Sequence, residues 1–173
     1  MRQLGARVEK TEERAISWGQ LRELGDFARV LLSEVPDLVD SHSGKALRFE
    51  GGDDDTCELN MHTLNSHIVK PLTLPFRCSY VELVSTGKQP PLIFMSHAWS
   101  TPLWQTLRLL EFYLQERCKL MGWGSADDVF VWVCTFANNQ HDLGELAGDL
   151  METPFVRAIQ SEGCLGTLVV LDG

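Results

Sequence analysis

The sequence predicts an α/β protein that contains a partial parallel sheet, with three strands visible, flanking helices and an N-terminal helical extension. Two observations support this prediction. Three short, almost wholly apolar runs at 92–95, 129–136 and 167–171 are bounded by turn residues, which is typical of strands buried on both faces. Helical patterns separate these runs, and alternation of strand and helix is typical of right-handed parallel units.

The first predicted element is a helix that begins after Ser17. Ser17 and Gln20 have the spacing of a capping box, in which each side chain bonds the backbone of the other. Apolar residues then recur at intervals of three and four and form one stripe, namely Trp18, Leu21, Leu24, Phe27, Ala28, Leu31 and Leu32. Pro36 should end this helix, and the glycine-, serine- and aspartate-rich run at 40–56 indicates a loop.

The middle of the chain leads into the strand-rich half. A short helix is predicted over 59–69, closed by Lys70 and Pro71. The segment 77–84 is compatible with a strand or a helix, because its periodicity does not distinguish them. The clearest boundary is Pro90-Pro91. We therefore divide the chain into a helical extension with an acidic loop (1–58), a lead-in segment (59–89) and an incomplete α/β domain (90–173).

In the α/β region, each helix is predicted to begin with a threonine cap followed by proline. Thr101-Pro102 starts a helix whose apolar face includes Leu103, Leu107, Leu110 and Leu114, and the glycine-rich run at 122–125 ends it. Thr153-Pro154 repeats the pattern for a helix over 155–161. A turn at 163–166 then leads to the last predicted strand.

Composition excludes several classes of partner. The 24 acidic and 15 basic residues give a formal charge of −9, which should repel phosphate backbones and anionic lipid, so we expect neither nucleic acid nor membrane as partner. The first residues lack the apolar core of a secretory signal, and no stretch approaches the ~20 apolar residues that cross a bilayer. The five cysteines are an odd number and widely spaced, which favours reduced thiols in a cytoplasmic protein.

Polar residues gather where the predicted strands end, which is where open parallel sheets bind ligands. The candidate ligand-binding residues are Ser96, His97, Trp99, Ser100, Trp132, Asn138, Asn139, Gln140 and Asp172. Hydroxyl, imidazole and amide groups can orient a polar ligand, and Trp99 offers a stacking face. Each of these residues also has a possible structural role. His97 could cap the next helix, Asn139 and Gln140 could close a loop by bonding backbone groups, and the tryptophans could be core residues.

Two other kinds of site are weighed against this one. Cys134 and His141 would suit a Cys/His hydrolase, but an apolar strand around Cys134 would raise the pKa of its thiol, and no orienting carboxylate is evident. Four zinc-type ligands also occur before the first strand, namely Cys57, His62, His67 and Cys78. Their spacing does not match a compact zinc knuckle, so we expect no metal and keep these residues only as an alternative.

The strand ends resemble the TIR (Toll/interleukin-receptor) and HET (heterokaryon-incompatibility) superfamily of signalling domains. The run LIFMSHAWS is similar to the first buried strand of those domains, which ends in a Ser-aromatic or Ser-His motif. Trp132 followed by Asn139-Gln140 is similar to the Trp-x(6)-Asn-Gln signature of the HET branch. The resemblance covers 59–173. It extends to a protist group with a Ser-His-Trp-Trp motif, which here reads Ser96-His97-Ala98-Trp99.

The resemblance implies a flavodoxin-like sheet and a signalling domain that acts by self-association or by binding protein partners. Many such domains cleave NAD with a glutamate on the helix after the third strand. That helix would follow Asp172-Gly173, so the resemblance implies a domain truncated at its C-terminus and inactive as given, with only His97 as a catalytic candidate. The alternatives are a fragment of an NAD-cleaving hydrolase, with NAD as a nucleotide substrate and no cofactor, or a zinc-stabilised module.

Overall fold

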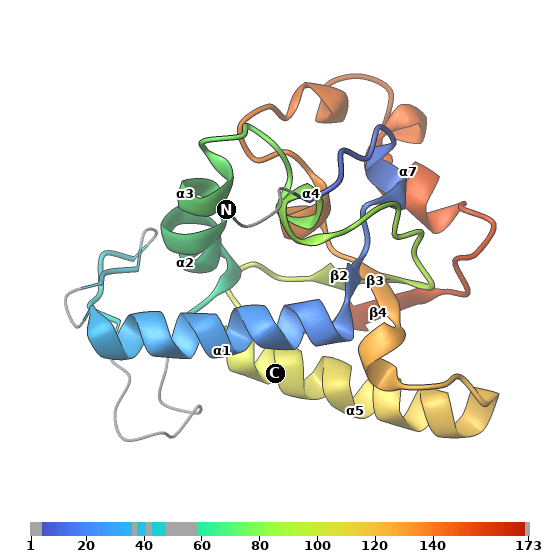
Figure 1. The fold of residues 1–173 in the computed structure, drawn as a ribbon, viewed down its shortest axis with the longest axis horizontal. Coiled ribbons are helices and arrows are strands. Elements are labelled where there is room, and N and C mark those ends of the chain that lie inside the picture. The colour runs from blue at the N-terminus through green and yellow to red at the C-terminus, as the bar shows by residue number, and fades with distance from the viewer. Residues whose placement is uncertain (1–4, 36–37, 41–42, 48–58, 172–173) are drawn as a thin grey trace.

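The computed structural model describes residues 5–35, 38–40, 43–47 and 59–171. These residues form a mixed α/β fold in which an open sheet lies between two layers of helices (Figure 1). The sheet has four strands in the order β1-β3-β2-β4. Their bounds are β1 (Ile16–Ser17), β2 (Ile93–His97), β3 (Phe130–Trp132) and β4 (Thr167–Val170).

The sheet contains one strand more than the sequence predicted. β2, β3 and β4 are the three predicted strands, and they are parallel, with β2 between the other two. β1 precedes the first helix and pairs antiparallel with β3, so that Ile16 lies opposite Val131. The prediction missed β1 because a strand of two residues has no periodicity of its own.

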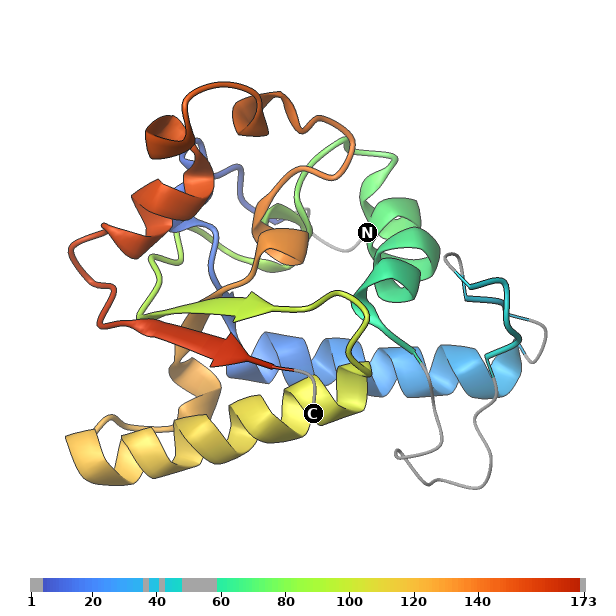
Figure 2. The same ribbon diagram turned by 180° about the vertical axis from the view of Figure 1, so that it is seen from behind.

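Helices α1 (Trp18–Glu34) and α5 (Leu103–Met121) cover one face of the sheet (Figures 1 and 2). The predicted capping box is confirmed, because the Gln20 backbone N–H donates to Ser17 Oγ at 3.1 Å and the Ser17 N–H donates to Gln20 Oε1 at 3.0 Å. The predicted cap at Thr101 is wrong by one residue. Pro102 occupies the cap position of α5, and no side chain caps this helix.

The lead-in segment is helical well beyond its predicted end. It comprises α2 (Met61–Leu64), the π-helical turn η3 (Asn65–Val69) and α3 (Lys70–Thr73). Pro71 was expected to stop the helix, but it lies in the first turn of α3, where its missing N–H removes little hydrogen bonding. The undecided segment at 77–84 contains helix α4 (Tyr80–Val84), which begins with a capping box formed by Ser79 and Glu82.

The second predicted strand is shorter than expected. The apolar run at 129–136 leaves the sheet after Trp132, and its second half forms helix α6 (Cys134–Ala137). The Ala137 N–H donates to the Val133 carbonyl at 3.0 Å, and Gln140 Nε2 donates to the Thr135 carbonyl at 3.1 Å. An apolar run of this length is buried equally well as a strand or as a helix, and contacts with the later loop favour the helix here.

The remaining helical elements are short. Helix α7 (Pro154–Ile159) has Thr153 at its cap position, as predicted, and lies over the opposite face of the sheet from α5 (Figure 2). Four 3₁₀ turns complete the described elements, namely η1 (Thr11–Glu13), η4 (Ala126–Asp128), η5 (Gly144–Leu146) and η6 (Leu150–Glu152).

The core follows the alternation of the central strand. Ile93 and Met95 of β2 belong to the main hydrophobic cluster, which extends in sequence from Ile16 to Val170. Phe94 faces the other way, into a smaller cluster with Trp132 and Ala158. The N-terminal extension, the lead-in segment and the α/β region therefore share one core.

Candidate functional site

The carboxyl ends of β2 and β4 lie side by side, with His97 opposite Val170. Helix α5 connects β2 to β3 across one face of the sheet, and α7 connects β3 to β4 across the other, so the chain leaves β2 and enters β4 from opposite faces (Figure 2). This arrangement forms a topological switch point, where doubly wound sheets bind ligands. Within the described part of the chain, His97 Nε2 is buried without a hydrogen-bond partner, and burial lowers the pKa of His97 to about 4.

The lowered pKa of His97 predicts a loss of stability in mild acid. In the unfolded chain the imidazole binds a proton near its ordinary pKa of 6.5, whereas the folded protein keeps it neutral down to about pH 4. Stability is therefore complete above pH 6.5 and decreases as the pH falls through this window. We expect a loss of about 2 kcal/mol between pH 7 and pH 5, measured by urea unfolding. His97→Gln should remove this loss, and an equal loss in that variant would contradict the assignment.

The aromatic and sulfur groups near this edge are held by structural contacts. Trp99 is half-buried and meets the His62 ring edge-on, with 5.1 Å between ring centroids. Burial raises the pKa of the Cys134 thiol, against hydrogen bonds from Trp99 and Thr135 that lower it. His141 lies elsewhere, with Nε2 at 2.9 Å from Thr73 Oγ1. The structure therefore does not form the Cys134–His141 pair that a hydrolase of this type would need.

The amides after β3 close the loop that follows α6. Asn139 Nδ2 donates to the Arg77 carbonyl at 2.8 Å, and Asn139 Oδ1 accepts the His141 N–H at 3.0 Å. Gln140 Oε1 accepts a bond of 3.2 Å from Asn65 Nδ2, which fixes the loop to η3. Asn138 is buried. Asn139 and Gln140 therefore make hydrogen bonds that hold the loop closed, which is the structural role that the sequence left open for them.

The other candidate residues are dispersed. Trp132 is fully buried, so the structure corrects its predicted ligand role to a core role, because its indole reaches no solvent-accessible space. Ser96 and Ser100 are exposed, and Asp172 and Cys57 lie outside the described residues. His67 Nε2 contacts the Val39 carbonyl at 2.9 Å. Among the described residues, no group of three or more His, Cys, Asp or Glu side chains is arranged to hold a metal.

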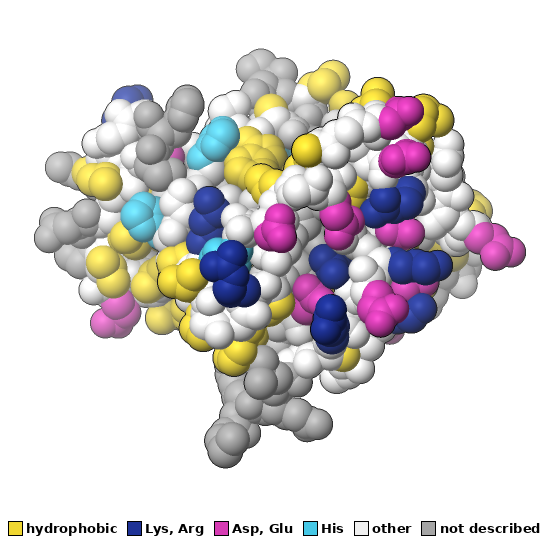
Figure 3. All heavy atoms as spheres, turned by 90° about the horizontal axis from the view of Figure 1, so that it is seen from above, with side chains coloured by type: hydrophobic (Ala, Val, Ile, Leu, Met, Phe, Trp, Pro, Cys, Tyr) yellow, Lys and Arg dark blue, Asp and Glu magenta, His cyan; other side chains and the backbone are white. Residues whose placement is uncertain are grey.

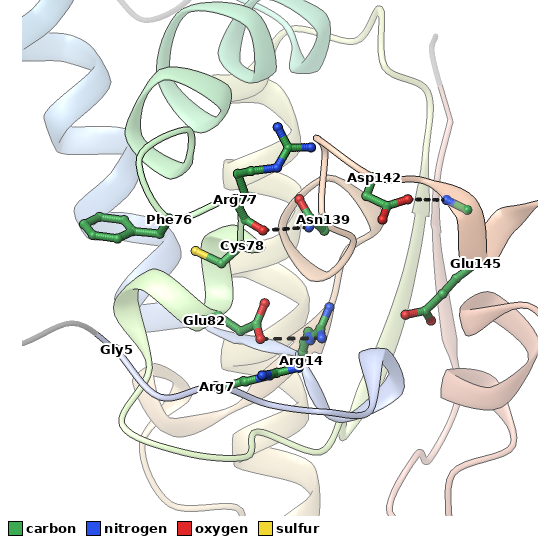
Figure 4. Close-up of a pocket in the computed structure, with 11 residues that line it drawn as sticks. Gly5, Arg7, Arg14, Phe76, Arg77, Cys78, Glu82, Asn139, Asp142 and Glu145 are labelled. Carbon is green, nitrogen blue, oxygen red and sulfur yellow. Dashed lines mark hydrogen bonds and ion pairs between the residues drawn. The ribbon is translucent and has the colours of Figure 1, made fainter.

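A cavity of about 690 Å³ lies apart from the strand ends (Figure 4). We call it the arginine cavity, because Arg7, Arg14 and Arg77 line it together with acidic groups from the segments at 76–82 and 139–145. Of the predicted site residues, it includes Asn139 and Cys78. Its volume lies in the usual range for small-molecule sites.

No family model, curated protein or solved structure matches the chain. In the described part of the chain, no helix combines the length and the apolar character that crossing a bilayer requires.

The floor of the arginine cavity is a buried ion pair. Arg14 is only 9% exposed, and its Nε and Nη2 both donate to the Val8 carbonyl, at 2.9 and 2.6 Å. Arg14 Nη2 lies 3.5 Å from Glu82 Oε1, and Glu82 also accepts the Val8 N–H at 3.1 Å. Sequence reasoning missed this group because its members lie more than sixty positions apart and have no local pattern.

On the face seen from above, acidic and basic side chains intermingle over one half (Figure 3).

Proposed function

We propose that this chain is a TIR/HET-like interaction domain that self-associates through the outer edge of β4. The single observation that carries the proposal is the character of that edge. β4 pairs with β2 on one side, and no described strand pairs with its other side. Unpaired N–H and C=O groups along an edge strand are a template for pairing with another chain.

This edge lacks the features by which proteins usually prevent pairing. The stretch at 163–171 contains no charged residue and no proline. Leu165, Val169 and Leu171 are exposed apolar side chains within it, with exposed fractions of 59%, 55% and 74%. A parallel strand is normally buried on both faces, so β4 presents a surface suited to being covered.

The occupant that fits best is a second copy of the chain. Each copy carries a formal charge of −9, so the net electrostatic interaction between two copies is repulsive. Because the β4 edge carries no charged residue, two copies can approach one another there without placing like charges side by side. Two identical edges related by a twofold axis would pair antiparallel and join the sheets, as in an isologous dimer.

The proposal predicts that one substitution on β4 weakens association. Sedimentation equilibrium over the micromolar range should detect a dimer, and Val169→Lys should raise the dissociation constant by about tenfold or more. Val30→Lys is the matched control, because Val30 is 59% exposed on α1, away from β4. A monomer at all concentrations, or equal weakening by both variants, would contradict the proposal.

The second candidate is a nucleotide site at the strand ends. The position of His97 beside Val170, with a buried and unpartnered Nε2, favours it. Release of nicotinamide from NAD, lost in His97→Gln, would support the NAD-cleaving alternative over a role in association alone. Self-association without turnover of NAD would support the interaction domain.

A further inference from the structure

The arginine cavity contains arginines that have no acidic partner in the described part of the chain. Of its acidic groups, Glu82 is paired with Arg14, and Glu145 accepts bonds of 3.0 Å from Arg157 and 3.1 Å from Thr11 Oγ1. Asp142 is the only acidic group of the lining without an ion pair. Within the described residues, neither Arg7 nor Arg77 has a side-chain hydrogen bond or an ion pair. The lining as a whole is balanced, with three arginines and three carboxylates, and Arg157 pairs with Glu12 as well as with Glu145. Arg7 and Arg77 therefore keep their guanidinium groups available for a ligand.

The buried arginine adds a third donor. Arg14 uses Nε and Nη2 for the Val8 carbonyl and Glu82, and its Nη1 forms no hydrogen bond with the described residues. A guanidinium N–H that is not used within the protein can donate to a ligand oxygen. The lining thus combines the buried Arg14 with two exposed arginines, Arg7 and Arg77 (Figure 4).

The backbone at Arg77 is a second, independent observation. Arg77 has φ of +49°, and its N–H donates to the Thr73 carbonyl at 2.8 Å, just past the end of α3. Glycine is the usual residue in a left-handed position that ends a helix, because it has no Cβ to clash. An arginine with this φ makes the folded backbone less stable than a glycine would. A function of its guanidinium group in the lining of the cavity would account for an arginine at this position.

Neighbouring groups are consistent with a positive rim. The pKa of His141 is lowered by burial and then by the positive charges of Arg77 and Lys70. Asn139 holds the Arg77 carbonyl at 2.8 Å, which fixes the turn that bears the arginine. Phe76 precedes Arg77 in the lining and is 47% exposed, so it supplies an apolar wall.

We infer that the arginine cavity binds the oxyanion group of a small anionic ligand, held by Arg7 and Arg77 with Arg14 beside them. Guanidinium groups present paired N–H donors that match the oxygens of phosphate and carboxylate groups. The inference is independent of self-association, because the cavity shares no residue with β4.

Titration calorimetry with two probes tests the site and identifies its ligand chemistry. Pyrophosphate and citrate, each at constant ionic strength, are titrated into the full chain. Binding of pyrophosphate alone assigns a phosphate ligand, and binding of citrate alone assigns a carboxylate ligand. Binding should weaken as sodium chloride is added, because salt screens charge pairs. If neither probe binds, the inference is overturned.

Two variants and one control separate binding from folding. Arg77→Gly and Arg7→Gln should each weaken binding of the probe by about tenfold or more. Arg77→Gly should leave the Tm unchanged or raise it, because glycine suits the left-handed backbone. Arg117→Gln removes one charge from the exposed side of α5 and should leave binding unchanged. Unchanged binding in both cavity variants, or equal weakening in the control, would overturn the inference.

Discussion

Replacing Trp132 by alanine is expected to lower the free energy of unfolding by about 3–5 kcal/mol, the range for removal of a buried aromatic side chain. Trp132 is fully buried at the end of β3. Its ring is stacked on Phe94 with 5.2 Å between centroids and meets Phe155 edge-on at 5.4 Å. Because most domains are stable by about 5–15 kcal/mol, this one change should remove much of the total. Urea unfolding measures it.

The hydrogen bond of Trp132 has its own test. The indole Nε1 donates to the Thr11 carbonyl at 3.0 Å and so joins β3 to the N-terminal segment. Trp132→Phe keeps an aromatic ring but removes this bond and leaves the Thr11 carbonyl with the Arg14 N–H at 3.2 Å, which should cost about 1 kcal/mol beyond the loss of packing. Trp104→Phe is the matched control, because Trp104 is 1% exposed and its Nε1 has no partner within the described residues. An equal loss in the two variants would show that the bond contributes nothing.

Gly5→Ala is expected to lower the free energy of unfolding by about 2–3 kcal/mol, because a side chain at this position overlaps backbone atoms. A Cβ on Gly5 would lie 2.0 Å from the Glu82 carbonyl oxygen. The N-terminal segment would have to move away from α4, which would break the bond of 2.9 Å from the Ala6 N–H to the Ser85 carbonyl. That movement also displaces Arg7, so binding of an oxyanion in the arginine cavity should weaken.

Gly19→Ala is the control for this substitution. A Cβ on Gly19 would lie 3.4 Å from the Asp127 carbonyl, which is ordinary contact. Gly19 is the second residue of α1, where alanine favours the helical backbone over glycine by less than the ~1 kcal/mol of a helix interior. Thermal unfolding should therefore shift in opposite directions for the two variants. A Gly5→Ala protein as stable as the unaltered chain would show that the segment does not pack closely on α4.

Local signals in the sequence predicted the elements whose causes are local. The capping box of Ser17 and Gln20 placed the start of α1, because a cap acts between residues three apart. The apolar runs identified β2 and β4, and for β2 the cause is burial on both faces, which needs apolar side chains at successive positions. The sequence by itself thus determined the α/β class and the position of His97 at the end of a strand.

Only the tertiary structure decided the features that join distant segments. The run after Trp132 became α6 rather than strand, and Gln140 bonds its carbonyls from the following loop. The addition of β1 to the sheet depends on pairing across more than a hundred residues. The arginine cavity depends on segments that approach one another because Gly5 lets the chain pass close to α4. Such contacts leave no periodic trace, because their energy comes from packing and charge between residues that are neighbours only in the folded chain.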